Sequence, residues 1–238
     1  HARRVLRQAC PGASARSSGL DAHYGGQAPE GLAYPRYVKP LKAAFSVLAR
    51  PVRHERELHD HTRFGKRELW VIRRLVEPFE RVARQRLPGC GTAHRMMLEE
   101  PVRAPQYNLD GYVWNGKLHV LGIVDAVMYP GTQAFMRFEL AAQVSRLPAS
   151  AAGRAAEVAR KFLSAVGFTH GMFNVELRLC PTTGHAKLIE INPRVAGQFY
   201  DLFERVDGYN LFDALVALEH ELAPVRHPLV CELAVLVG

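Results

Sequence analysis

The chain has 238 residues, 48% of them apolar and 23% charged, and this composition excludes a disordered or fibrous protein. No apolar run reaches the roughly 18 residues of a typical membrane-spanning helix, and the four cysteines are too widely separated for a disulfide framework. The net charge of +8 is scattered rather than clustered with aromatic residues, which favours an anionic small ligand over nucleic acid. We therefore expect a globular cytoplasmic protein with neither a membrane nor a nucleic-acid partner.

The first half of the chain is predicted to form two short strands followed by helices. A segment rich in Gly, Ala, Ser and Pro over residues 11–33 indicates a loop. Strands are expected around residues 37–39 and from 45 to 48, and apolar residues at helical spacing predict one or two helices over 56–87. Within these helices we expect an apolar core face that includes Trp70, Leu75 and Phe79.

The second half is richer in strands. Strands are expected over residues 95–100, 107–114 and 117–127, and Asn115-Gly116 predicts a tight hairpin turn between the last two. A helix over 151–166 is followed by two strands, 171–179 and 185–191, which flank a Pro-Thr-Thr-Gly turn and should be antiparallel neighbours. A last helix over 210–222 precedes a strand over 229–237, which we expect to lack a partner. This mixed order predicts an α+β fold.

Two carboxylates and an amide are the most informative polar residues. Glu190 and Asn192 project to the same side of their strand because side chains alternate, and Glu176 lies on the neighbouring strand. Two carboxylates held close together repel one another unless a cation lies between them. Magnesium fits such oxygen ligands, with manganese as the alternative ion. The pattern therefore predicts a metal site formed by Glu176, Glu190 and Asn192.

These residues and several other segments resemble the ATP-grasp superfamily. The resemblance is carried by FNVE at residues 173–176, IEINPR at 189–194, PRYVKP at 35–40, LEEPV at 98–102 and LDGYVWNGKLHVLGIVD at 109–125. It implies two α/β lobes that hold a nucleotide between them, with an antiparallel sheet in the larger lobe. The small lobe is expected over residues 1–97, the large lobe with the metal site over 98–222, and the start of a truncated C-terminal element over 223–238.

The resemblance also implies roles for individual residues in ATP binding. Lys39 would contact the nucleotide phosphates and take part in catalysis, Glu99 would bind or orient groups at the adenine amino group, and Gln106 would contact the ribose. The backbone at Glu100 and Val102 would pair with the adenine edge.

A second set of implied roles concerns the phosphates and the metal. The segment at residues 41–46 lacks the family's glycines, so the Ser46 hydroxyl is expected to contact phosphate. Glu176, Glu190 and Asn192 match magnesium ligands. Asn174 stands where some ligases of the family carry a catalytic Arg, which leaves Arg194 to steady the phosphoryl group or the activated carboxylate.

The function implied is an ATP- and magnesium-dependent ligase that joins a small-molecule carboxylic acid to an amine, or a similar nucleophile, through an acylphosphate. The alternative is a nucleotide-binding ATP-grasp module without ligase activity, which the glycine-poor loop favours and the three oxygen ligands oppose. No Lys precedes Lys39, so we also expect an N-terminally truncated chain without the family's first nucleotide lysine.

Overall fold

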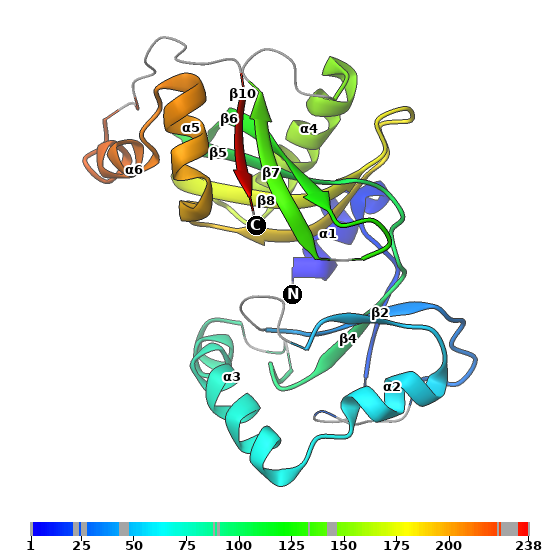
Figure 1. Cartoon of the computed structure of the whole chain (residues 1–238). Helices are drawn as coiled ribbons and strands as arrows, with labels where there is room; N and C mark the ends of the chain where they lie inside the picture. The colour runs from blue at the N-terminus through cyan, green and yellow to red at the C-terminus, as the bar shows by residue number, and fades with distance from the viewer. Residues whose placement is uncertain are drawn as a thin grey trace. The chain divides into compact units, whose positions relative to one another are not determined.

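The computed structural model divides the chain into two compact units, residues 15–102 (unit 1) and residues 2–14 with 103–238 (unit 2) (Figure 1). The structure describes residues 2–20, 24, 28–42, 48–87, 89, 91–132, 134–141, 147–222, 224 and 233–237. The division falls after Val102, whereas the sequence placed it after residue 97. The first residues belong to unit 2 because α1 (Ala2–Ala9) buries Leu6 in the core of that unit.

Unit 1 is built on a four-stranded antiparallel sheet with two helices. Its strands follow the order β1 (Ser17–Gly19), β4 (Met96–Glu99), β2 (Arg36–Pro40), β3 (Arg50–Val52), and its helices are α2 (Glu55–Thr62) and α3 (Lys66–Arg86). Residues 45–47 of the strand expected over 45–48 lie outside the described part. The described strand β3 begins at Arg50, two residues after Leu48, whose backbone is left-handed with φ of 64°.

The α3 helix buries a different face from the one expected. Trp70, Leu75 and Phe79 are 59%, 60% and 42% exposed, so their assignment to the core was wrong. The buried positions are Ile72, Val76 and Glu80, which follow one another at four-residue spacing. Apolar residues occur around most of this helix, and their spacing alone could not show which side contacts the sheet.

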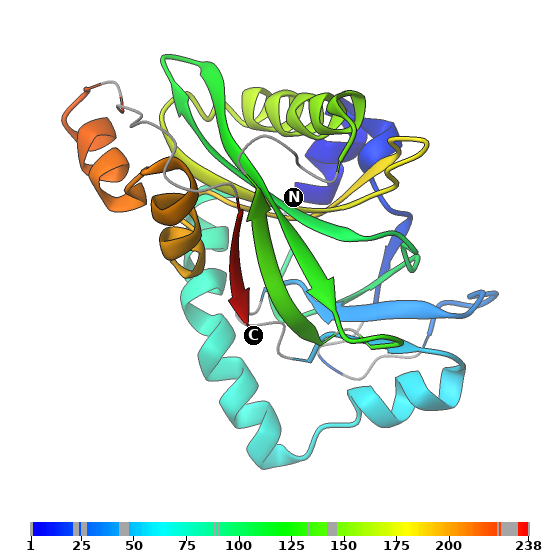
Figure 2. The ribbon, with the colours of Figure 1, turned by 45° about the horizontal axis from the view of Figure 1, so that its top comes forward.

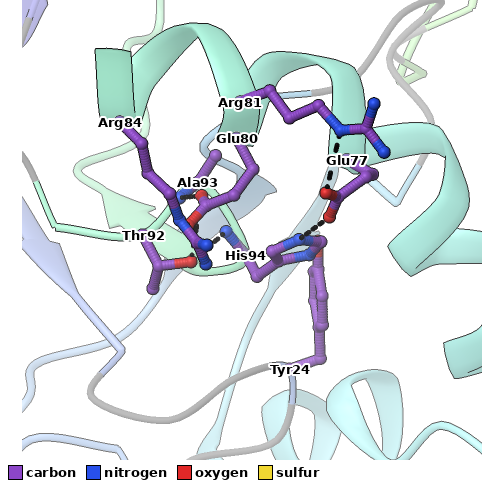
Figure 3. Close-up of polar contacts among 8 residues, drawn as sticks. All are labelled: Tyr24, Glu77, Glu80, Arg81, Arg84, Thr92, Ala93 and His94. Carbon is purple, nitrogen blue, oxygen red and sulfur yellow. Dashed lines mark hydrogen bonds and ion pairs between the residues drawn. The ribbon is translucent and has the colours of Figure 1, made fainter.

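A buried carboxylate, Glu80, ties α3 to the segment that leads into β4 (Figure 3). Its Oε2 accepts hydrogen bonds from the Ala93 amide at 2.5 Å and the Thr92 hydroxyl at 3.1 Å, and Arg84 Nε donates to its Oε1 at 2.9 Å. The hydrogen bond from the Ala93 amide contributes most to lowering the pKa of Glu80. Arg84 and Thr92 lower this pKa further, whereas burial raises it. Glu80 is therefore charged in the folded protein at neutral pH.

Glu80→Gln is expected to lower the free energy of unfolding by about 2 kcal/mol at pH 7, because hydrogen bonds to a charged group contribute about 1.5–3 kcal/mol. The folded-state pKa is lowered, so this stabilisation is present above the unfolded-state pKa and is lost as the pH falls through the folded-state pKa. Urea unfolding at pH 7 and at about pH 3 measures the difference, which should shrink in acid. Glu77→Gln, on the same helix with a side chain 48% exposed, is the control. Equal losses in both variants would show that Glu80 does not tie α3 to β4.

Unit 2 is built on a six-stranded antiparallel sheet. The strands follow the order β10 (Leu233–Val237), β7 (Phe135–Ala141), β6 (Lys117–Met128), β5 (Gln106–Trp114), β8 (Gly171–Leu179), β9 (Ala186–Asn192). Helices α1 and α4 (Ala149–Ala165) pack on one face, and α5 (Tyr200–Asp207) and α6 (Leu211–Glu219) on part of the other (Figures 1 and 2). The short helices η1 (Pro11–Ala13) and η2 (Gly197–Phe199) complete the unit.

One sequence prediction for unit 2 is confirmed by its strands, and another is wrong. The Asn115-Gly116 turn is confirmed, with φ of 47° and 74° at the two positions between β5 and β6. The expectation that the last strand lacks a partner was wrong, because β10 pairs with β7, a strand that the sequence did not predict. Among the described residues, no helix has the length and hydropathy needed to cross a membrane.

Candidate active site

In unit 1, two residues predicted to bind ATP form an ion pair. Lys39 Nζ lies 2.7 Å from Glu99 Oε2, and the two side chains are only 18% and 8% exposed. Lys39 is opposite Met97, and Tyr37 is opposite Glu99, so the pair joins diagonal neighbours on one face of the β2–β4 ladder. An ammonium group has three N–H donors, and a carboxylate that holds it in place leaves it able to donate to an anion as well.

The other predicted residues of unit 1 follow β4. The Glu100 amide donates to the Arg16 carbonyl at 2.9 Å, so this NH is engaged in the backbone and the carbonyl is the group left to pair with an adenine amino group. Val102 is half-buried and is the last residue of unit 1. Ser46 lies outside the described residues. The roles of all three in nucleotide binding stay predictions.

In unit 2, polar side chains form two rows across three neighbouring strands. Asn108, Glu176 and Glu190 are register partners on β5, β8 and β9. Asp110, Asn174 and Asn192 form the next row in the same way. The rows lie two residues apart along each strand, so they occupy one face of the sheet. The structure thus brings Glu176, Glu190 and Asn192 together.

Hydrogen bonds link the members of these rows. Asn192 Nδ2 donates to Asn174 Oδ1 at 3.4 Å, and Asn174 Nδ2 donates to both carboxylate oxygens of Asp110 at 3.1 Å. Gln106 Nε2 donates to Glu176 Oε2 at 3.3 Å, so Gln106 contacts a predicted metal ligand. Because the Asn192 amide nitrogen faces Asn174, its oxygen is the atom left to bind a cation.

Asp110 is the most strongly perturbed acid of this face. Its side chain is 3% exposed, and burial raises its pKa to about 8; the Asn174 hydrogen bond and Arg194 lower the value, whereas the Glu176 charge raises it. Asp110 therefore holds a proton at neutral pH and adds little negative charge beside Glu176. The next residue, Gly111, must lack a side chain, because a Cβ there would lie 2.3 Å from the His119 carbonyl oxygen.

The pairing of Glu176 with Glu190 depends on an irregularity in β9. Leu177 is opposite Leu188 and Glu176 is opposite Glu190, so Ile189 is an extra residue, a β-bulge. In an unbroken ladder Glu176 would lie opposite Ile189, and Glu190 would share a face with Leu188. Leu188 is buried in the core beneath α1 and α4, so the bulge lets Leu188 and Glu190 point to opposite faces.

Arg194 follows the end of β9 and is exposed. It lies two residues after Asn192, its Nη1 donates to the Val195 carbonyl at 3.1 Å, and its charge lowers the pKa of Asp110. This position is compatible with a cation that contacts an anionic substrate at the edge of the polar face. Its catalytic role stays a prediction.

The chain is similar to known proteins in sequence and in fold. No protein-family model matches the chain. Carnosine synthase 1 from Gallus gallus is 36% identical over 140 residues, which are 58% of this chain and 14% of that protein. The L-amino acid ligase from Bacillus licheniformis superposes with a TM-score of 0.65 and 18% identity over 94% of this chain and 47% of that one. A carboxyaminoimidazole ribonucleotide synthase from Aspergillus clavatus, complexed with ATP, superposes with a TM-score of 0.69 and 16% identity. This match covers 100% of this chain and 55% of that one.

This chain has the ATP-grasp fold. The predicted α+β architecture with an antiparallel sheet is thereby confirmed. The chain spans about half the length of the two ATP-grasp structures and a smaller part of carnosine synthase 1.

The polar face of this ATP-grasp chain offers a donor set suited to a hard cation. Glu176 and Glu190 provide carboxylate oxygens from paired strands, and Asn192 provides an amide oxygen one row away. Magnesium binds oxygen ligands and usually keeps waters or substrate phosphate oxygens in its shell, so three protein ligands suffice. The described residues contain no group of three His, Cys, Asp or Glu side chains that could hold a metal ion. With two carboxylates and one amide oxygen, the donor set would need phosphate and water oxygens to complete a magnesium shell.

Sequence reasoning missed Asn108 and Asp110, which lie in the same two rows as the predicted ligands. A signal was present, because Gln106, Asn108 and Asp110 occupy every second position of a strand whose intervening residues are apolar. In a half-exposed strand such alternation is ordinary. All three are buried here, and a buried polar stripe indicates hydrogen-bonded or functional groups.

Proposed function

We propose that this chain is the nucleotide-binding and metal-binding part of an ATP- and magnesium-dependent ligase that joins a carboxylic acid to an amine through an acylphosphate. The observation that carries the proposal is the cross-strand pair Glu176–Glu190 with Asn192 beside it, on a sheet of ATP-grasp fold. The ligase class is supported by the likeness to carnosine synthase 1 and to an L-amino acid ligase.

In the proposed reaction a carboxylate oxygen attacks the γ-phosphorus of ATP, the bond to the β-phosphate oxygen breaks, and ADP leaves. The amine nitrogen then attacks the acyl carbon, phosphate leaves, and the nitrogen loses a proton. Such phosphoryl transfer depends mainly on positioning and charge stabilisation. Small-molecule carboxylates and amines are thus the substrates we propose, and neither nucleic acid nor a membrane takes part.

The residues have distinct roles in this proposal. Glu176, Glu190 and Asn192 hold magnesium, which when bound neutralises phosphate charge. Lys39 binds a phosphate oxygen, and the Arg194 guanidinium steadies the transferred phosphoryl group or the acyl group. The adenosine part is bound by a further set of groups: Glu99, the backbone of Glu100 and Val102, and Gln106, with the Ser46 hydroxyl on a phosphate.

Phosphate release measures the proposed activity directly. The full-length protein is incubated with ATP and magnesium against a panel of amino acids and other carboxylates, each with and without an amine. We expect carboxylate-dependent release of phosphate that stops when the metal is chelated. ATP binding without phosphate release from any member of the panel would contradict ligase activity and support a nucleotide-binding module.

Lys39→Ala is expected to weaken ATP binding about ten- to a hundredfold while adenosine binding changes little, because a charge-assisted hydrogen bond contributes about 1.5–3 kcal/mol. Calorimetric titration with ATP and with adenosine measures both affinities. The variant also leaves the buried Glu99 carboxylate without its lysine partner, which is a cost unrelated to phosphate.

The matched control removes both charges of the ion pair. Lys39→Met combined with Glu99→Gln leaves no unpaired buried charge, so its free energy of unfolding should be closer to that of the wild type than the Lys39→Ala value. ATP binding should remain weak in this double variant. Equal weakening of ATP and adenosine by Lys39→Ala would mean that Lys39 supports the fold and does not contact phosphate. The double variant is compared by its stability, because Glu99 is itself proposed to bind adenosine.

A further inference from the structure

The bulge in β9 is contacted by an arginine from the other end of the chain. Arg3, on α1, donates from Nη1 to the Leu188 carbonyl and from Nη2 to the Ile189 carbonyl, the second at 2.8 Å. These two carbonyls belong to the bulged residue and to the residue before it. A single guanidinium therefore binds the backbone at the position where the β8–β9 ladder is interrupted.

The geometry of this contact depends on the bulge. Consecutive carbonyls of a regular strand point toward opposite neighbours, so one side chain cannot easily bind both. A bulge changes the local direction of the backbone and leaves the extra residue out of the ladder. Among the described strands, β9 lies at the edge of its sheet and has β8 as its neighbour. The planar fork of Arg3 thus supplies donors to both carbonyls at the position where the ladder is interrupted.

The contact affects the face to which Glu190 projects. The sheet needs Leu188 in the core beneath α1 and α4, and it needs Glu190 opposite Glu176 on the polar face. Residues two apart in a regular strand share a face, so only the extra residue Ile189 meets both requirements. A group that stabilises the bulged backbone therefore stabilises the orientation of Glu190.

We propose that Arg3 is a positioning residue for the metal site: it holds the bulge at Ile189 and thereby directs the Glu190 carboxylate toward Glu176. This inference rests on the proposed function, because it takes Glu190 to be a metal ligand. Arg3 contacts β9 through two backbone carbonyls. Its effect on the metal is exerted through the strand.

The first test compares Arg3→Gln with Arg7→Gln, a control at an exposed position of the same helix. Mn²⁺ serves as the probe, and its affinity for the nucleotide-free protein is measured by electron paramagnetic resonance. Arg3→Gln should weaken Mn²⁺ binding about tenfold or more, the usual effect of losing a group that orients a metal ligand. Hydrogen exchange of the metal-free protein should be faster at residues 186–192. Arg7→Gln should change neither quantity.

The second test removes the need for the bulge. Deletion of Ile189 makes Leu188 and Glu190 adjacent, so a regular ladder keeps both the Leu177–Leu188 and the Glu176–Glu190 pairs. Arg3→Gln should therefore weaken Mn²⁺ binding much less in this background than in the wild type, which a double-mutant cycle measures as coupling. Equal loss of affinity in both backgrounds would show that Arg3 acts only on general stability and would overturn the proposal.

Failure of this inference is distinguishable from failure of the proposed function. If the wild type binds Mn²⁺ neither alone nor together with ATP, Glu190 is not a metal ligand, and both the proposed metal site and the positioning role fall. If the wild type binds Mn²⁺ and Arg3→Gln changes neither its affinity nor exchange in β9, the metal site stands and the role of Arg3 is overturned. Weaker binding together with faster exchange supports both.

Discussion

Glu190→Gln is expected to lower magnesium-dependent nucleotide turnover by about a hundredfold or more, the usual effect of losing one electrostatic contact to the reacting groups. Glutamine keeps the size of the side chain but removes one of the two negative charges that attract the magnesium ion. Glu190 is exposed and lies opposite another carboxylate, and like charges placed opposite one another destabilise a sheet. The metal-free variant should therefore unfold at the same urea concentration as the wild type, or slightly higher.

The matched control is Glu219→Gln, at an exposed position at the end of α6. It removes one carboxylate from unit 2 without touching the polar face, so turnover should stay within about twofold of the wild type, as surface substitutions usually have small effects. Turnover by Glu190→Gln within about tenfold of the wild type would contradict the assignment of Glu190 as a metal ligand.

Asp110→Asn is expected to remove a pH dependence of stability. The folded-state pKa of Asp110 is raised from 3.8 to about 8, so between these values the folded protein keeps a proton that the unfolded chain releases. The stability of the wild type therefore falls as the pH rises through this interval and stops falling above about pH 8. At about 1.4 kcal/mol for each pKa unit, the fall attributable to Asp110 between pH 5 and 8 is about 4 kcal/mol.

Urea unfolding at pH 5 and pH 8, in the presence of a chelator, measures this effect. Asparagine cannot ionise, so the variant should lose less stability than the wild type over the interval and should be the more stable protein at pH 8. Asp213→Asn, at an exposed position on α6, is the control and should follow the wild type. Parallel pH profiles for Asp110→Asn and the wild type would mean that Asp110 is ionised in the folded protein.

Local patterns predicted several elements correctly because their causes lie within a few residues. The Asn115-Gly116 turn needs a positive φ at two successive positions, which these residue types adopt easily, and the hairpin is present. The Pro-Thr-Thr-Gly turn likewise joins β8 and β9 as antiparallel neighbours. Helical spacing located α3. It could not identify the buried face, because that depends on the sheet against which the helix packs.

Pairing between distant segments was beyond such patterns. β10 and β7 are far apart in the chain, and their pairing depends on the whole order of strands in unit 2. The pKa of Asp110 also depends on segments that are far apart in the chain. Its residue type predicts a charged acid, and only burial against β8 and the nearby Glu176 gives it a pKa of about 8.

The candidate metal site shows most clearly what each level contributes. The sequence by itself determined the candidate donor set, because Glu176, Glu190 and Asn192 carry side-chain oxygens of the kind that bind magnesium. Strict alternation would have placed Glu190 on the same face as Leu188. Only the tertiary structure decided otherwise, because burial of Leu188 beneath α1 and α4 requires an extra residue at Ile189, and Arg3 binds the carbonyls exposed there. The physical reason is that a bulge has no local sequence signature here: it is set by core packing and by an arginine more than 180 residues away along the chain.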